Sequence, residues 1–128
     1  MSKPPVPDDV RRFILTSVPS VPYLEALLLL RSEPSRVWDA AVVKSRLYIS
    51  ETRALELLLA LHASGIAVRT AEGGFQYGPS TDELRAVLDR VAATYATNLV
   101  GVTELIHSRI DKRAMQFADA FRWKKEDK

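Results

Sequence analysis

The fold is decided by residues 35–78, which read SRVWDAAVVKSRLYISETRALELLLALHASGIAVRTAEGGFQYG. Ser35 is a suitable cap for a first helix over Arg36–Lys44, because a serine hydroxyl accepts a hydrogen bond from an otherwise unpaired backbone N–H. The apolar turn Leu47-Tyr48-Ile49 follows. The segment therefore predicts a short helix that ends in a tight turn.

A second helix and a β-hairpin follow directly. Ser50 is placed to cap a helix over Glu51–Ser64, and Gly65 is placed to end it. Ile66–Arg69 and Phe75–Tyr77 alternate apolar and polar residues as strands do, and a Gly-Gly pair before the second strand suits a hairpin turn. Helix, turn, helix and hairpin is the order of a winged helix-turn-helix.

This order predicts a mostly α chain with a small β-hairpin, which is a winged helix-turn-helix extended by C-terminal helices. In helix-turn-helix modules the second helix is the recognition element that enters the DNA major groove. Its apolar side chains should pack on the hairpin and the first helix. The residues expected to be buried together are Leu55, Leu58, Leu61, Ile66, Val68 and Phe75.

Composition is that of an ordinary globular domain. The chain has 128 residues, of which 47% are hydrophobic and 27% charged, and it has no cysteine. The lack of cysteine excludes disulfides and thiol chemistry and fits a reducing cytoplasm. The longest apolar run, Ala26–Leu30, is too short to cross a membrane, and the Pro-rich start does not resemble a signal peptide. We expect a cytoplasmic protein without a membrane partner.

Four segments are expected along the chain. Two helices should precede the helix-turn-helix. The first is expected over Asp8–Val18. The second should be capped by Ser20, reach Ser32 and end at Glu33-Pro34. The expected segments are a disordered tail at 1–7, a winged helix-turn-helix domain with its N-terminal helices at 8–80, C-terminal helices at 81–122 and a charged tail at 123–128.

The C-terminal third reads as one long helix and one shorter helix. Ser80 and Glu83 have capping-box spacing, which predicts a helix start. The apolar pattern then continues to about Ile106, and Ser108 or Asp111 should start the last helix.

These helices present more apolar surface than a small winged domain can cover. Contiguous apolar patches on monomers rarely exceed a few hundred Å², so a two-fold homodimer is expected. The alternative is a monomer in which the last two helices fold onto Val10, Phe13 and Ile14. The residues expected at the dimer interface are Leu84, Leu88, Val91, Tyr95, Val102, Leu105, Phe117 and Phe121.

The start Ser50-Glu51-Thr52-Arg53, the run from Leu55 through Gly65 to Arg69 and the long helix after Ser80 resemble winged helix-turn-helix regulators of the MarR or PadR type. The resemblance holds at superfamily level. It implies a bacterial-type repressor or activator of transcription that binds double-stranded DNA and dimerises through terminal helices.

The candidate DNA contacts lie on both helices and on the hairpin. Arg53 could contact guanine or a phosphate, or it could be a solvated arginine paired with Glu56. Lys44 and Arg46 suit phosphate contacts, which position the module without reading sequence. The expected DNA-binding residues are Lys44, Arg46, Ser50, Thr52, Arg53, Arg69 and Gln76.

A second hypothesis follows from charge. The segment 36–78 carries only one more basic than acidic residue, although phosphate neutralisation supplies most non-specific DNA affinity. A winged-helix module that has lost DNA binding and binds a protein partner is therefore the alternative. No catalytic arrangement is visible, and the single Glu-x-x-His pair, Glu104 and His107, falls short of the two that a di-metal bundle needs. We expect no enzyme activity, metal or cofactor.

Overall fold

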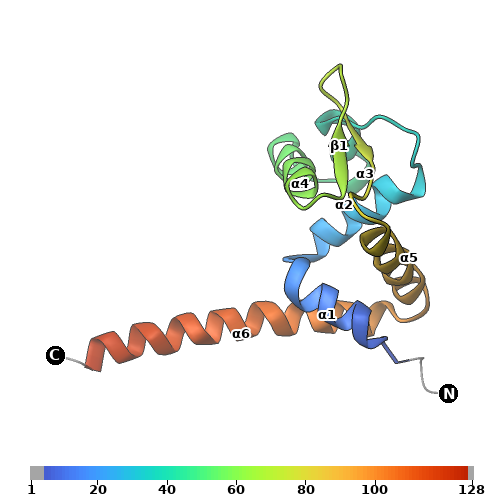
Figure 1. The fold of residues 1–128 in the computed structure, drawn as a ribbon. Helices are drawn as coiled ribbons and strands as arrows, with labels where there is room; N and C mark the ends of the chain where they lie inside the picture. The colour runs from blue at the N-terminus through green and yellow to red at the C-terminus, as the bar shows by residue number, and fades with distance from the viewer. Residues whose placement is uncertain (1–4, 127–128) are drawn as a thin grey trace. The chain divides into compact units, whose positions relative to one another are not determined.

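In a computed structural model the chain is mostly α-helical with one small antiparallel β-hairpin, which confirms the expected fold class (Figure 1). The structure describes the backbone of residues 5–126 and the side chains of residues 5–110, 112 and 116. The elements are α1 (Asp8–Ser17), α2 (Val21–Ser32), α3 (Ala40–Leu47), α4 (Glu51–Ala63), β1 (Ala67–Arg69), β2 (Phe75–Tyr77), α5 (Asp82–Thr97) and α6 (Leu99–Glu126).

The chain forms two compact units. The hairpin unit is Val21–Ala93, and the helical unit combines Met1–Ser20 with Thr94–Lys128. The first helix therefore groups with α6 and not with the helix-turn-helix, because α1 packs its buried Val10 and Ile14 in the unit that contains α6.

The core of the hairpin unit is built around α4, which packs against α2, α3 and β1. Leu58, Leu61, Ile66 and Phe75 are buried as expected. The other two expected core residues are not buried, since Leu55 is 44% exposed and Val68 is 45% exposed. The remaining buried residues of α4 are Ala54 and Leu57.

This error has a simple cause. Because α4 carries leucine at five positions, its apolar pattern does not fix which face is inward. The buried face is rotated from the expected one and leaves Leu55 outside.

The first helix of the helix-turn-helix starts later than expected. Its cap is Asp39, whose carboxylate accepts a hydrogen bond from the Val42 N–H at 2.9 Å, so the prediction of Ser35 as cap is wrong. The residues before it are extended, because Trp38 and Phe75 exchange backbone hydrogen bonds of 2.6 and 2.8 Å. Trp38 thus adds one residue pair to the edge of the hairpin.

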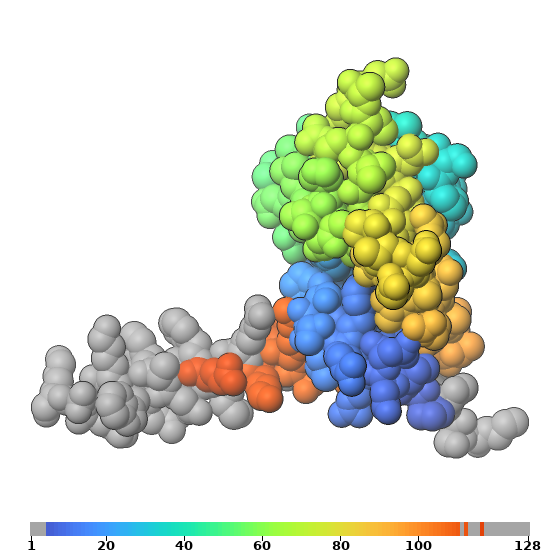
Figure 2. Space-filling view, in the orientation of Figure 1, coloured from blue at the N-terminus to red at the C-terminus, as the bar shows by residue number. Residues whose placement is uncertain are grey.

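The second helix and the hairpin agree with the sequence. Ser50 Oγ accepts a hydrogen bond from the Arg53 N–H at 3.1 Å, which confirms this cap. Gly65 follows α4 at a φ of +77°, where glycine is favoured, and the Ile66 N–H donates to the Leu61 carbonyl at 2.9 Å. The strands pair with Ala67 opposite Tyr77, and the hairpin tip projects from the body of its unit (Figure 2).

The C-terminal helices are divided at a different residue. One helix to Ile106 was expected, but α5 ends at Thr97 and α6 then runs without interruption past Ser108 and Asp111. The division occurs at Asn98, whose side-chain oxygen accepts the Gly101 N–H at 3.0 Å and so satisfies an unpaired donor of the first turn of α6.

The cap of α5 also differs by one residue. Thr81 Oγ1, and not Ser80, accepts the helix-starting hydrogen bond, from the Leu84 N–H at 3.0 Å. The expected tails at 1–7 and 123–128 lie partly outside the described residues, which exclude residues 1–4 and 127–128. Residues 123–126 belong to α6, which continues to Glu126. Within the described chain, none of the helices is by itself both long and apolar enough to cross a membrane.

The two faces of α4 give the first testable difference. We expect Leu58→Ala to lower the free energy of unfolding by about 2–5 kcal/mol, because it removes a fully buried side chain. Leu55→Ala, on the same helix and 44% exposed in the parent chain, should cost less than about 1 kcal/mol. Urea denaturation measures both free energies of unfolding. Equal losses in the two variants would show that α4 does not bury the face described here.

Candidate nucleic-acid interface

The turn between α3 and α4 holds a strained residue. Tyr48 has φ +57° and ψ +46° and its side chain is 94% exposed. The Ile49 N–H donates to the Lys44 carbonyl at 3.3 Å. The same hydrogen bond between residues five apart ends α4, where the left-handed residue is Gly65 and not a tyrosine. The left-handed conformation costs an L-residue about 1–2 kcal/mol, and burial of the ring does not offset it here.

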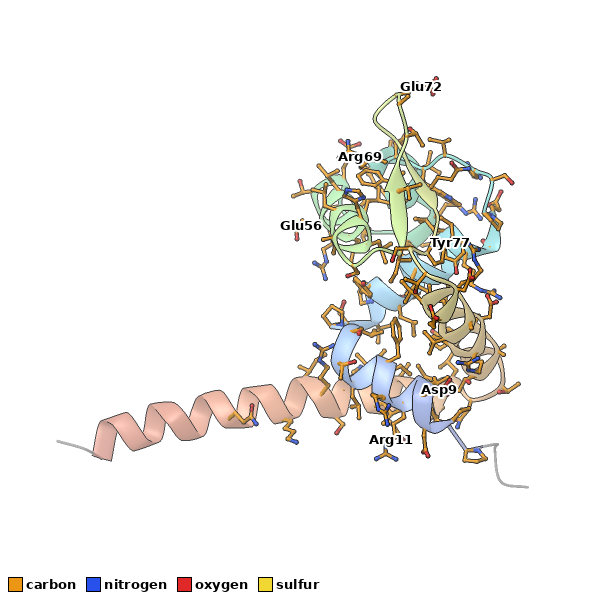
Figure 3. All side chains as sticks on the ribbon, in the orientation of Figure 1. Asp9, Arg11, Glu56, Arg69, Glu72 and Tyr77 are labelled. Carbon is orange, nitrogen blue, oxygen red and sulfur yellow. The ribbon has the colours of Figure 1, made fainter. Side chains whose placement is uncertain are left out.

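The first turn of α4 presents the expected polar residues to solvent. Thr52 and Arg53 are exposed, and the Ser50 hydroxyl is engaged in capping the helix. Arg53 Nη1 lies 3.4 Å from Glu56 Oε2, so the predicted alternative of an exposed ion pair is present. Glu56 points away from α4 into solvent (Figure 3).

The rest of the outer face of α4 is apolar. Leu55 and Leu59 are 44% and 43% exposed, and their spacing of four residues puts them side by side on the helix. This face therefore combines two leucines with an arginine–glutamate pair.

The basic residues of α3 have different surroundings. Lys44 is exposed and forms no ion pair with any carboxylate in the described part of the chain. Arg46 Nη2 lies 3.5 Å from Glu33 Oε2, and its guanidinium carbon lies 5.6 Å from the ring centre of Trp38. Arg36 contacts the same two residues, at 3.4 Å from Glu33 and 4.6 Å from the ring centre of Trp38.

The hairpin residues are held by internal contacts. The guanidinium carbon of Arg69 lies 4.4 Å from the ring centre of Phe75, and its Nη2 donates to the Gly73 carbonyl at 3.3 Å. Gln76 Nε2 donates to the Ser35 carbonyl at 3.0 Å, which fastens the segment before α3 to β2. Glu72 occupies the tip (Figure 3).

All seven expected DNA-binding residues belong to the hairpin unit. The structure gives Ser50 a capping role and Gln76 a fastening role. The other five remain at the surface, and they are Lys44, Arg46, Thr52, Arg53 and Arg69. The sequence did not predict that Glu33, Arg36 and Trp38 lie together. Their contacts join the end of α2 to the last turn of α3, and no local pattern predicts such a pairing.

The expected dimer residues divide into three sets. Leu88, Val91 and Val102 are fully buried within a single chain, so a partner is not needed to cover them. Leu84, Tyr95 and Leu105 are half-buried, and the side chains of Phe117 and Phe121 lie outside the described residues. Among the side chains of α6 that the structure describes, the exposed large apolar ones are Leu99, Val100 and Ile110.

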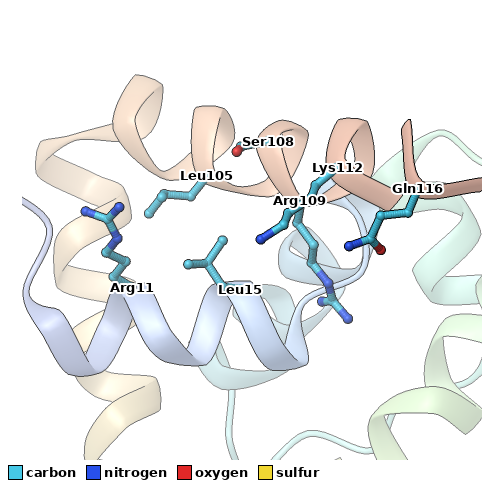
Figure 4. A pocket seen from close by; sticks show the side chains of 7 residues that line it. All are labelled: Arg11, Leu15, Leu105, Ser108, Arg109, Lys112 and Gln116. Atoms are coloured by element: carbon cyan, nitrogen blue, oxygen red, sulfur yellow. The ribbon is translucent and has the colours of Figure 1, made fainter. Parts of the chain in front are cut away.

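The helical unit contains a pocket of about 360 Å³ between α1 and α6 (Figure 4). Leu15 and Leu105 form its apolar part, and Arg11, Arg109 and Lys112 surround them. The lining is completed by Ser108 and Gln116. The three cations and two leucines have the chemistry to hold an anion that carries an apolar group.

The titratable groups of the hairpin unit with shifted pKa values are structural. Burial raises the pKa of Tyr77, and the charge of Asp89 adds to the effect. Burial also raises the pKa of Tyr23, although its hydrogen bond to Ser64 Oγ at 3.0 Å lowers it in part. Both phenols are therefore protonated and neutral near pH 7.

The described residues contain no group of three or more His, Cys, Asp or Glu side chains that could hold a metal ion. His62 Nδ1 lies 3.1 Å from the Ala67 carbonyl and its ring meets Phe75 edge-on, which gives this histidine a packing role.

Comparisons with protein-family models, with curated proteins and with solved structures found no match to this chain.

Tyr48→Gly tests the strain in the turn. We expect the free energy of unfolding to rise by about 1 kcal/mol, because glycine adopts the left-handed conformation without the penalty that tyrosine has. Tyr48→Ala is the matched control, which removes the ring but keeps the strain, and it should change stability little. Denaturant titration measures both, and a loss of stability in the glycine variant would contradict the assigned strain.

Proposed function

We propose that this chain is a DNA-binding transcriptional regulator of the winged helix type, similar in plan to MarR and PadR proteins, which acts as a homodimer in the cytoplasm. The observation that carries the proposal is the arrangement of α3, α4 and the hairpin in one compact unit, with the first turn of α4 exposed. In helix-turn-helix complexes this turn contacts base edges, and the preceding helix crosses the DNA backbone.

The charges around α4 fit contacts to the DNA backbone. Lys44 on α3 and Arg69 on the hairpin flank α4 in sequence and are exposed. The ion pair between Arg53 and Glu56 has an atom separation of 3.4 Å and two partly exposed side chains. Pairs of this kind contribute about 0–1 kcal/mol, so Arg53 can exchange its partner for DNA at small cost.

The length of α6 supports the homodimer. At 1.5 Å per residue the 28 residues of α6 span about 42 Å, whereas the 10 residues of α1, which packs on it, span about 15 Å. Because α6 is longer than α1 and isolated helices are marginal in water, we propose that a partner helix packs on α6 as well. Ile110, Phe117 and Phe121 recur at helical spacing in the sequence of α6, and a second copy of α6 is the proposed partner.

A specific observation favours a second candidate function. The exposed leucines at positions 55 and 59 give α4 an apolar outer face beside Glu56. Protein–protein interfaces use such faces, and a glutamate repels DNA phosphates. The second candidate is therefore a winged-helix module that binds a protein through α4.

Binding to duplex DNA separates the two candidates. We expect Lys44→Ala to weaken binding to all sequences alike and to reduce the salt slope by about 0.9, since one phosphate contact is lost. Arg53→Ala should weaken binding most for the preferred sequence. Fluorescence anisotropy with a random 20-base-pair pool and with sites selected from it, at roughly 50 mM salt where phosphate contacts are strong, measures both effects.

Arg12→Ala is the matched control, because Arg12 is an exposed arginine of α1 in the helical unit. It changes the net charge equally and should leave DNA affinity unchanged. No binding of the parent chain under these conditions would reject the regulator and favour the protein-binding module.

Light scattering tests the homodimer. The expected mass is twice the 14.3 kDa of one chain. Ile110→Glu should shift the mass toward a single chain, because it puts a charge into the proposed helix interface, whereas His107→Glu, at an exposed polar position of the same helix, should keep the dimer. A parent chain that remains at 14.3 kDa at micromolar concentration would show a monomer.

A further inference from the structure

Two arginines of the hairpin unit share one aromatic ring and one carboxylate. The guanidinium carbons of Arg36 and Arg46 lie 4.6 and 5.6 Å from the ring centre of Trp38. Trp38 is fully buried, so the ring is a fixed support. Tryptophan is the best cation–π partner for arginine, and the contact restricts both long side chains before any ligand arrives.

The carboxylate of Glu33 marks a point that both guanidinium groups can reach. Its Oε1 lies 3.4 Å from Arg36 Nη1, and its Oε2 lies 3.5 Å from Arg46 Nη2. Carboxylates and phosphates are recognised by the same planar fork of guanidinium donors. A phosphate oxygen placed there would accept from two arginines.

Glu33 holds this position weakly. Both separations exceed the 2.7–3.2 Å of well-formed N–H···O bonds, and the side chains of Glu33, Arg36 and Arg46 are 42%, 39% and 45% exposed. An exposed pair of this kind contributes about 0–1 kcal/mol. A nucleic-acid phosphate can therefore displace Glu33 while both arginines stay on the ring.

The cluster is attached to the elements that flank α4. Arg46 lies in the last turn of α3, two residues before Tyr48. The segment with Arg36 is fastened to β2 by the hydrogen bond from Gln76 to the Ser35 carbonyl and by the Trp38–Phe75 pairing. The first helix of the motif is the one that crosses the DNA backbone.

We infer that Arg36 and Arg46, supported by Trp38, form a binding site for one phosphate group of the DNA backbone, which Glu33 occupies in the free protein. This inference rests on the proposed DNA-binding function and adds to it a two-arginine phosphate contact and an internal competitor. Glu33 lowers the affinity for all DNA sequences alike, because a phosphate contact reads no bases.

The test is Glu33→Gln, which keeps the shape of the side chain and removes its charge. The apparent dissociation constant for a fluorescein-labelled 20-base-pair duplex of random sequence should fall about twofold to fivefold, as expected for loss of an exposed ion pair. The salt slope should change little, because the same phosphate is neutralised in the complexes of the parent chain and of the variant. Circular dichroism checks that each variant is folded.

Two further variants make the result specific. Glu25→Gln removes the same charge from an exposed position of α2 and should leave affinity unchanged. In the Arg36→Ala/Arg46→Ala background, Glu33→Gln should give no gain, since its effect requires the two arginines.

Binding by the parent chain with equal affinities for Glu33→Gln and Glu25→Gln would overturn the phosphate site and leave the regulator standing. A gain that persists without the arginines would also overturn the site, because it would reflect net charge alone. No binding by any variant would overturn both the regulator and the site.

Discussion

The inward face of α4 is the constraint on which the hairpin unit depends. Ala54, Leu57, Leu58 and Leu61 are buried on that face, and the helix packs against α2, α3 and β1 at once. Because one helix serves three neighbours, its rotation about its own axis is fixed by the core. The side chains that it shows to solvent are consequently fixed as well, so the chemistry of the outer face follows from the packing of the inner one.

Local signals were sufficient where a residue acts within its own turn. Ser50 and Gly65 were identified from sequence because a cap bonds only three residues away and a left-handed glycine needs no distant partner. The pairing of Trp38 with Phe75 is different, since 37 positions separate two residues that exchange backbone hydrogen bonds. That contact keeps the segment before Asp39 extended and moves the helix start away from Ser35.

The candidate site was predictable only as a set of exposed cations. Lys44, Arg53 and Arg69 are at the surface, as their positions in the pattern suggested. What each cation touches depends on contacts between distant segments, such as that of Glu33 with Arg46, which no periodicity encodes. The break at Asn98 was missed for another reason, because an apolar rhythm that continues across a helix boundary hides it.

The base of the hairpin is closed by two backbone hydrogen bonds from the segment after β2 to the segment before β1. The Gly78 N–H donates to the Ile66 carbonyl and the Ser80 N–H to the Gly65 carbonyl, each at 2.9 Å. At the tip, a side chain added at Gly73 would meet no atom within 4 Å. Residues inserted at the tip, next to Gly73, would add only loop entropy, about 0.6 kcal/mol for each doubling of loop length. The length of the hairpin can therefore change in this protein while the stability of the core stays the same.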